Sequence, residues 1–171
     1  LLVFGAFLMF VCGLAAAQEA NYQPAKTADE AVARIESLGG SVRYLSRGSD
    51  LLEIDFQFAG DRVRDEHLQD LHVLPNVAVL RLKQTAITDA GLIHVAKLPK
   101  LVRLQLDETV ITDVGLLHLK PLANLESLQL YRTKVTDSGL KHLAELPQLK
   151  QLIVGETAVT AQAVHELTQS K

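Results

Sequence analysis

The sequence is poor in cysteine, in aromatic residues and in net charge. Its 171 residues contain a single cysteine, Cys12, no tryptophan, 5% aromatic residues and a formal net charge of -3. Without a second thiol, intrachain disulfide bonds and cysteine-based zinc sites are excluded within these residues. Nucleic-acid-binding proteins usually carry a clustered basic face, and this composition supplies none. We therefore expect no nucleic-acid partner.

Short catalytic motifs are also missing. The sequence has no G-x-S-x-G, P-loop, H-E-x-x-H or dinucleotide-binding fingerprint. Serine, histidine and aspartate all occur, but no spacing pairs them into a triad. We predict that the protein is not an enzyme and uses no cofactor.

The first 17 residues, Leu1 to Ala17, are apolar and uncharged. They end in Ala15-Ala16-Ala17, which is typical of the small-residue cleavage site of a secretory signal peptide. The basic segment expected before the apolar run is missing, and the chain starts with Leu. We predict export to the periplasm, the cell surface or the medium. An uncleaved membrane anchor is one alternative, although 17 residues are few for a membrane span. A lipoprotein signal at Cys12 is another, although Val11 stands where a small residue is expected.

The abundant feature of the sequence is a period of 24 residues from about residue 77 onward. Four columns of identical residues carry it: Thr85, Thr109, Thr133 and Thr157; Asp89, Asp113 and Asp137; Gly91, Gly115 and Gly139; and Leu98, Leu122 and Leu146. An apolar segment recurs as Val77-x-x-Leu80-x-Leu82, Leu101-x-x-Leu104-x-Leu106, Leu125-x-x-Leu128-x-Leu130 and Leu149-x-x-Leu152-x-Val154. Periods of this length indicate a repeat architecture.

A weaker copy precedes these four. In a constant 24-residue register, Phe56 and Phe58 align with Leu80 and Leu82, and Asp65 aligns with Asp89. We interpret it as a degenerate first repeat.

These residues resemble the leucine-rich-repeat family, whose strand motif is L-x-x-L-x-L. The segment ITDAGLIHVAKLP, residues 87–99, is similar to bacterial repeats and to the repeats attached to F-box proteins. The polar position after the strand is often Asn or Cys in the family, and here it is Thr. The resemblance covers about residues 51–171. It implies an α/β solenoid of parallel concave strands and short convex helices, and a role in binding another protein.

Physical patterning within one repeat agrees with this interpretation. The leucines of each apolar segment alternate with other residues, which predicts a strand with one buried face. The column threonine then turns the chain, and its hydroxyl is expected to bond to the adjacent coil. Thr88, Thr112 and Thr136 stand at N-cap positions, each followed by an Asp that favours a helix N-terminus. The spacing of Leu92 and Val95 predicts a short helix.

The predicted organisation has four parts: residues 1–17 as a signal peptide, 18–26 as a polar tether, 27–50 as an N-terminal cap and 51–171 as about five repeats. In the cap, Thr27-Ala28-Asp29-Glu30 predicts a helix start and Gly39-Gly40 its end. Val42–Leu45 and Leu52–Phe58 then predict a hairpin. At the other end, Ala161 and Ala163 replace the Asp and Gly columns, which favours a capping helix.

The concave strand face is the candidate binding site, because solenoids bind partners there. The residues predicted to contact a partner protein are Arg81, Lys83, Arg103, Gln105, Asp107, Gln129, Tyr131 and Arg132. Tyr131 and Arg132 are the expected anchor pair, since both residue types are common at binding hot spots. An ordinary solvated face, self-assembly through the edge strand at 151–155, and carbohydrate binding are the alternatives. The scarcity of aromatic residues disfavours the last.

Two repeated columns raise the question of metal binding. His94, His118 and His142 recur with the period, but one residue per coil places them about 5 Å apart, whereas zinc ligands must converge at about 2 Å from the ion. The Asp column lacks the oxygen-dense, glycine-rich loop that calcium sites use. We predict no metal.

Overall fold

The computed structural model describes residues 22–169 of the chain. Its elements, in chain order, are α2 (Ala28–Ser37), β1 (Ser41–Tyr44), β2 (Leu52–Asp55), the 3-10 helices η1 (Gly60–Arg62) and η2 (Asp65–Val73), β3 (Val77–Arg81), α3 (Leu92–Val95), β4 (Arg103–Gln105), α4 (Asp113–Leu117), β5 (Ser127–Gln129), α5 (Asp137–Leu143), β6 (Gln151–Ile153) and α6 (Ala161–Gln169). The predicted signal peptide, at 1–17, lies outside the described residues. Within them, no helix is both long and apolar enough to cross a membrane.

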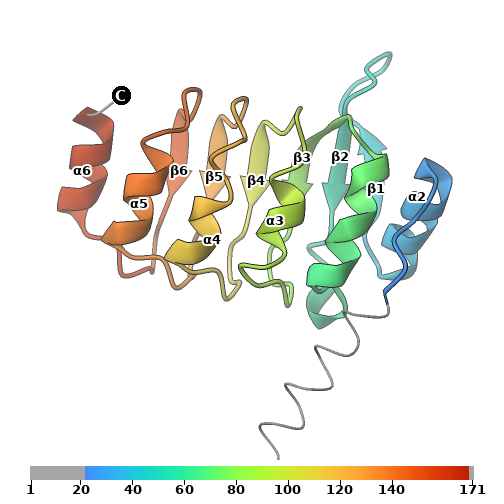
Figure 1. The fold of residues 1–171 in the computed structure, drawn as a ribbon, viewed down its shortest axis with the longest axis horizontal. Helices are drawn as coiled ribbons and strands as arrows, with labels where there is room; N and C mark the ends of the chain where they lie inside the picture. The colour runs from blue at the N-terminus through green and yellow to red at the C-terminus, as the bar shows by residue number, and fades with distance from the viewer. Residues whose placement is uncertain (1–21, 170–171) are drawn as a thin grey trace, which may run out of the picture.

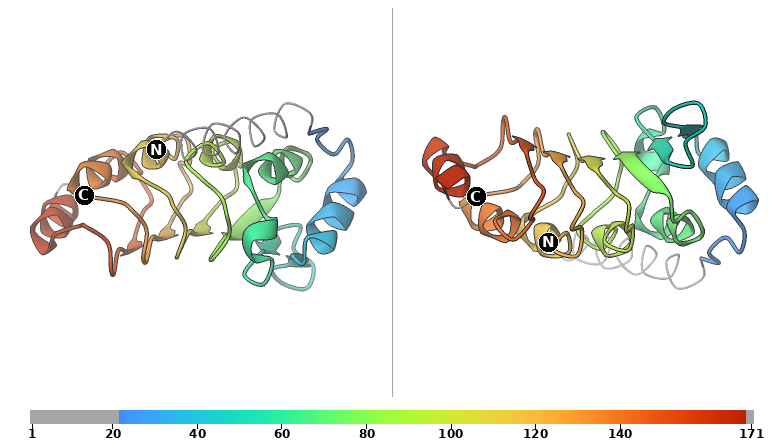
Figure 2. Two further views of the ribbon diagram at one scale, coloured as in Figure 1. Left: turned by 90° about the horizontal axis from the view of Figure 1, so that it is seen from below. Right: turned by 90° about the horizontal axis from the view of Figure 1, so that it is seen from above.

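The strands form a single mixed sheet in the order β1-β2-β3-β4-β5-β6, as the described part of the chain shows (Figure 1). The β1–β2 pair is antiparallel and all later pairs are parallel. From β3 to β6, equivalent residues 24 positions apart lie side by side, as Leu80, Leu104 and Leu128 do. Seen along its edge, the sheet forms one layer and the short helices form a second, so one sheet face is left open (Figure 2).

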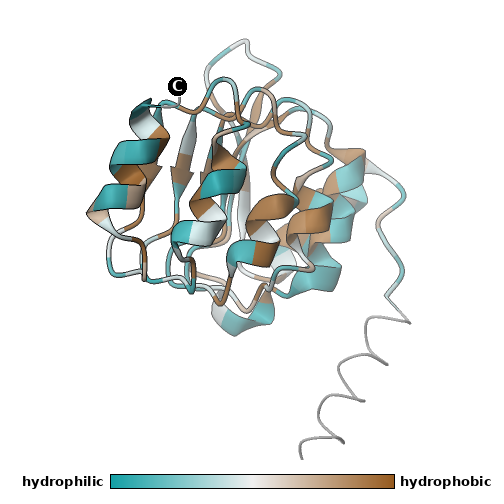
Figure 3. Cartoon of the chain, turned by 60° about the vertical axis from the view of Figure 1, so that its left-hand side comes forward, coloured by the Kyte–Doolittle hydropathy of each residue, from teal (hydrophilic) through white to brown (hydrophobic). Residues whose placement is uncertain are grey.

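The core lies between these two layers. Leu80, Leu104 and Leu128 on the strands are 0% exposed, and so is Leu92 at the start of α3. Leucines from successive repeats therefore share one interior, as the alternation of the strand segments predicts. The helices carry both hydrophobic and hydrophilic residues (Figure 3), because only one side of each faces the sheet.

The helices are short because apolar residues recur every third position. In η2 the buried Leu68 and Leu71 are three residues apart, and this spacing suits the three-residue turn of a 3-10 helix. The two predicted N-caps in the middle of the array are confirmed: the Thr112 hydroxyl accepts a hydrogen bond from the Val114 N–H, and Thr136 caps α5 in the same way.

The register predicted for the first repeat is wrong by two residues. Ile54, not Phe56, lies opposite Leu80, and the Phe56 N–H bonds to the Arg81 carbonyl as later repeats do two positions on. The chain leaves β2 through a turn closed by the Ala59 N–H on the Phe56 carbonyl and then through η1. This loop holds two extra residues, so Phe58 is 83% exposed rather than buried.

The N-terminal helix and hairpin lie close to where the sequence predicts them. Thr27 caps α2 by accepting from the Glu30 N–H, and Gly39, with a φ of +89°, follows its end. The capping box is modified, since the Glu30 carboxylate accepts from the N–H of Lys26 instead of Thr27.

Residues 22–26, predicted as part of a polar tether, instead pack against the domain. Ala25 is 1% exposed, and its N–H donates to Asp70 Oδ1 at 2.7 Å. The Tyr22 hydroxyl donates to the other Asp70 oxygen, and the Arg34 guanidinium lies 3.4 Å from the same carboxylate. The buried Asp70 therefore attaches this segment to η2.

Candidate functional site: the open sheet face

The open sheet face is formed by strand residues that point away from the helices. Two rows cross it from β2 to β6: Glu53, Val79, Arg103, Ser127 and Gln151, and then Asp55, Arg81, Gln105, Gln129 and Ile153. Beyond the strand ends, Lys83, Tyr131 and Arg132 continue it along the rim. The constant-period register had placed Asp55 and Gln57 in the two rows. The loop insertion shifts these assignments to Glu53 and Asp55.

At the β2 end of the face, carboxylates and guanidinium groups neutralise each other. Arg81 Nη2 lies 2.8 Å from Glu53 Oε1, and Arg81 Nη1 lies 3.7 Å from Asp55 Oδ2. Arg43 on β1 reaches the same two acids at 3.6 and 4.0 Å. Arg81 is thus where the sequence places it, but its charge is already paired within the protein.

The centre of the face is polar and less tightly paired. Arg103 is exposed on β4, between Val79 and Ser127 in the row. Gln105 and Gln129 lie side by side on the next row, each half-buried. These three predicted residues come together as expected and present amide and guanidinium groups to solvent.

Asp107 differs from the prediction that it contacts a partner. Its side chain is 7% exposed, and Oδ1 accepts a hydrogen bond from the Tyr131 N–H at 2.9 Å. Burial raises the pKa of the Asp107 carboxyl above its ordinary value, and the hydrogen bond from Tyr131 opposes that rise. Asp107 therefore holds the following repeat in place instead of projecting from the face.

Tyr131 and Arg132, the predicted anchor pair, are organised by a third residue that sequence reasoning missed. Arg132 lies over the Tyr131 ring, 5.1 Å from its centroid. The Tyr131 hydroxyl donates to one oxygen of Glu156, and Arg132 Nε donates to the other at 2.6 Å. Glu156 comes from the next repeat, exactly one period after Arg132, so the 24-residue column could have revealed the pairing.

Four rim residues at equivalent positions have left-handed backbone conformations. Their φ values are 57° at Gln84, 57° at Glu108, 54° at Arg132 and 53° at Glu156. Residues other than glycine rarely adopt this region, because Cβ approaches the following carbonyl. Their side chains pair across repeats: Gln84 donates to Glu108 at 2.9 Å, and Lys83 lies 3.4 Å from the same carboxylate. The rim is therefore a ladder of long polar side chains.

The Thr and Asp columns form a second ladder, on the helix side of the sheet. Oδ1 of each Asp accepts from the backbone N–H of a threonine 23 residues later, and Oδ2 accepts from its hydroxyl. The pairs are Asp65 with Thr88, Asp89 with Thr112, Asp113 with Thr136 and Asp137 with Thr160. The sequence analysis had assigned these aspartates to helix dipoles alone, so their main role was missed.

The other threonine column was predicted to bond to the adjacent coil, and that prediction is wrong. The Thr85 hydroxyl donates to the Leu82 carbonyl of its own repeat at 2.7 Å, and Thr109 bonds in the same way to Leu106. Each hydroxyl thus satisfies a carbonyl where its own strand ends, because the side chain is buried inside the turn.

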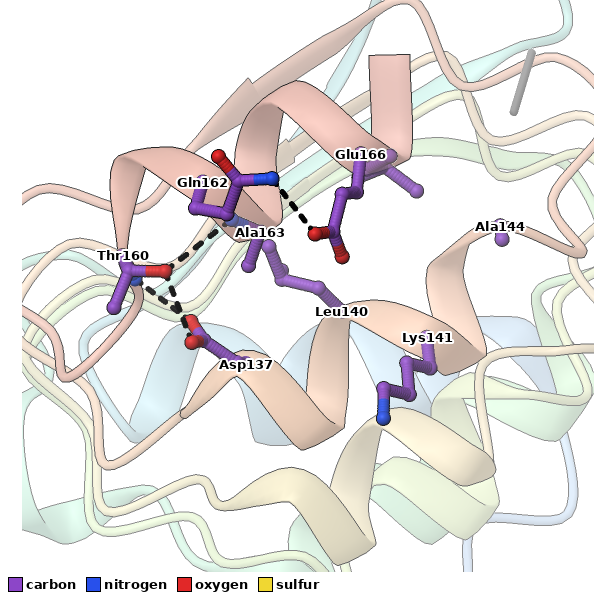
Figure 4. A pocket seen from close by; sticks show the side chains of 9 residues that line it. Asp137, Leu140, Lys141, Ala144, Thr160, Gln162, Ala163 and Glu166 are labelled. Carbon is purple, nitrogen blue, oxygen red and sulfur yellow. Dashed lines mark hydrogen bonds between the residues drawn. The ribbon is translucent and has the colours of Figure 1, made fainter. Parts of the chain in front are cut away.

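The glycine column makes room for the Asp ladder. A Cβ on Gly91, Gly115 or Gly139 would overlap Oδ1 of the preceding aspartate. In the last repeat Ala163 takes this position, and an open groove of about 440 Å³ lies there between α5 and α6 (Figure 4). Leu140, Ala163 and Leu167 line it together with Lys141 and Glu166.

The histidine column gives no convergent metal site. Across residues 22–169, no three His, Cys, Asp or Glu side chains are grouped so that they could hold an ion. Burial lowers the pKa of His94 below its ordinary value. This favours the neutral ring, in keeping with a packed helix residue.

Comparisons with known proteins are sparse. No family model and no curated protein matches the chain. Among solved structures, an internalin from Listeria monocytogenes is 17% identical, with a TM-score of 0.41. The match covers 58% of this chain and 35% of the internalin chain. A likeness at this level carries no argument about function.

Proposed function

We propose that the chain is an exported leucine-rich-repeat module that binds another protein through its open sheet face. The observation that carries the proposal is the face itself: strands 24 residues apart present aligned rows of polar side chains that no helix covers. A repeated, uncovered strand surface of this kind is the usual binding surface of a solenoid.

The Tyr131–Arg132 pair supplies the expected anchor. Glu156 holds both side chains, so they lose little further freedom on binding. The remaining guanidinium N–H groups of Arg132 stay available to a partner. Asp107 is left out of the proposed contact set because it is buried.

The proposed role is non-catalytic. The charged groups at both ends of the face are committed to ion pairs, with Arg81 held by Glu53 and Arg132 held by Glu156. Groups fixed in this way can shape a recognition surface, whereas a general acid or base must exchange its proton with substrate.

Partner binding is favoured over self-assembly through β6. The edge of this strand is open within the sheet layer, but α6 extends past it in the helix layer (Figures 1 and 2). A second copy that paired with β6 in the plane of the sheet would meet α6. We expect a monomer in light scattering across the accessible concentration range.

The binding test uses two double variants on opposite faces. Tyr131→Ala with Arg132→Ala should abolish capture of a specific partner from native extract and leave the far-UV spectrum unchanged. The control pair, Val114→Ser with Leu117→Ser, removes exposed apolar side chains from α4. If the control loses the partner and the sheet-face variant keeps it, the interface lies on the helices and the proposal is wrong.

Export has its own test. Cleavage after Ala17 would give a mature N-terminus at Gln18, close to the first described residues. Intact mass measurement on protein recovered from the native envelope or medium should show that end. A protein that retains Leu1–Ala17 would instead support the anchor alternative.

A further inference from the structure

The positive charges of the open sheet face differ in whether a carboxylate accompanies them. Arg43 and Arg81 share Glu53 and Asp55, Lys83 lies 3.4 Å from Glu108, and Arg132 donates to Glu156. In each case the protein supplies its own counter-charge. These cations can orient a partner but have little charge left to offer.

Arg103 is the exception among the residues that the structure describes. It lies on β4, in the middle of the face, and no acidic group comes within 4.0 Å of it. Its row neighbours are the uncharged Val79 and Ser127, and Gln105 follows on the same side of the strand. Its guanidinium is exposed and carries a full, unpaired charge.

A hollow of about 350 Å³ lies beside Arg103. Its other lining residues are Val102, Glu126, Ser127, Lys150 and Gln151. The acid in this lining is already neutralised, since Lys150 Nζ lies 2.9 Å from Glu126 Oε1. The Ser127 hydroxyl, on a residue only 7% exposed, donates to Gln151 Oε1 at 3.0 Å. The hollow is therefore polar, neutral apart from Arg103, and built on packed strands.

We propose that this hollow receives an aspartate or glutamate side chain from the protein that binds the open sheet face. A guanidinium presents parallel N–H donors that match the two oxygens of a carboxylate, and such pairs are stronger than neutral hydrogen bonds. The inference rests on the proposed function, because it names the chemistry that the same face recognises.

A protein segment fits the hollow better than a free small anion. One exposed ion pair contributes little on its own, so the carboxylate needs further contacts to be held. The Tyr131–Arg132 anchor supplies them from the neighbouring strand, four residues further along than the row of Arg103. At about 3.3 Å per residue, the two contact points are about 13 Å apart along the strands. An extended partner segment would span them with about four residues.

The test selects peptides from a displayed random library on the wild-type chain and on Arg103→Glu. Wild-type selection should enrich Asp or Glu at one position, about four residues from an apolar or aromatic position. Selection on Arg103→Glu should enrich Lys or Arg at that same position. Arg47→Ala, which removes an exposed arginine from the β1–β2 turn, is the matched control and should select the same acidic peptides as wild type.

Affinities of the best wild-type peptide then separate the two proposals. Arg103→Ala and a Glu→Gln change in the peptide should each weaken binding at least tenfold, without an additive effect when combined. If Tyr131→Ala with Arg132→Ala abolishes binding but Arg103→Ala does not, the face is correct and the carboxylate assignment is overturned. If neither variant matters, or if no peptide is selected, both proposals fail.

A second arm separates the source of the carboxylate. Labelled polygalacturonate, an acidic polysaccharide, is offered to the wild type and to Arg103→Ala. We expect no saturable binding to either. Saturable binding that requires Arg103 would assign the hollow to an acidic glycan and overturn the protein assignment.

Discussion

Asp89 binds Thr112 of the following repeat through both oxygens of its carboxylate: Oδ1 accepts from the backbone N–H at 2.8 Å and Oδ2 from the hydroxyl at 2.6 Å. The Thr112 hydroxyl in turn accepts from the Val114 N–H at 3.2 Å. One carboxylate therefore fixes the start of the next helix and joins two repeats. Because a repeat cannot bury its apolar residues alone, contacts of this kind decide how well the array holds together.

Asp89→Ala should destabilise the whole domain. It removes two charge-assisted hydrogen bonds and leaves a part-buried N–H and hydroxyl without acceptors, at a cost of about 2 to 4 kcal/mol. Urea unfolding monitored by circular dichroism measures the change. Asp29→Ala, at an exposed position in the first turn of α2, is the control and should stay within about 0.5 kcal/mol of wild type. Equal losses in the two variants would contradict the ladder.

Gly115→Ala tests the fit between the glycine and the aspartate columns. In an exposed helix this change usually stabilises by up to about 1 kcal/mol, but here the new Cβ would overlap Asp89 Oδ1. We expect destabilisation in wild type and a smaller cost in the Asp89→Ala background. The double-mutant cycle should give a coupling of about 0.5 to 3 kcal/mol, and strict additivity would refute the proposed clash.

The sequence predicts those parts of the fold that depend on patterns within one repeat. The spacing of Leu80 and Leu82 is enough to predict a strand with a buried face, and Thr112 is recognisable as an N-cap from its neighbours. The Asp–Thr contact joins residues 23 positions apart, so its geometry appears only when the repeats are stacked. Columns alone could not distinguish it from a local helix-dipole effect, which would use the same residue.

The candidate site was predictable where the period is unbroken. From β3 to β6, residues such as Arg103 and Gln129 lie on the face as the register requires. At β2 the period fails, because a loop insertion has no apolar pattern to reveal it. Phe56 and Phe58 both match a leucine in type, so either could have filled the core.

Phe56 and Phe58 distinguish the observed register from the constant-period one. Phe56 is 1% exposed and Phe58 is 83% exposed. Phe56→Ala should cost about 3 to 5 kcal/mol, as for other buried aromatic residues. Phe58→Ala should leave the unfolding midpoint almost unchanged. Comparable losses for the two variants would restore the 24-residue alignment at β2.

Tyr22 should make the stability of the domain sensitive to alkaline pH. Burial, together with its hydrogen bond to Asp70, raises the pKa of Tyr22 to about 12 from an ordinary value of 10.0. A raised pKa means that the folded state favours the protonated phenol, so this contribution is complete below pH 10 and is lost between about pH 10 and 12. The stability difference between wild type and Tyr22→Phe should therefore shrink over that range in urea titrations. A difference that stays constant from pH 8 to 11.5 would separate Tyr22 from the Asp70 contact.

Leu104→Asp tests the stacking of the repeats as a whole. Leu104 is 0% exposed and lies between Leu80 and Leu128 in the centre of the array. A carboxylate at this position would have no partner in an apolar interior, and its desolvation cost is comparable to the entire stability of a small domain. The variant should therefore lack a cooperative thermal transition. Gln105→Asp, one residue later on the open face, introduces the same group into solvent and should melt much like wild type. A near-native melt of Leu104→Asp would show that the leucine columns do not share one interior.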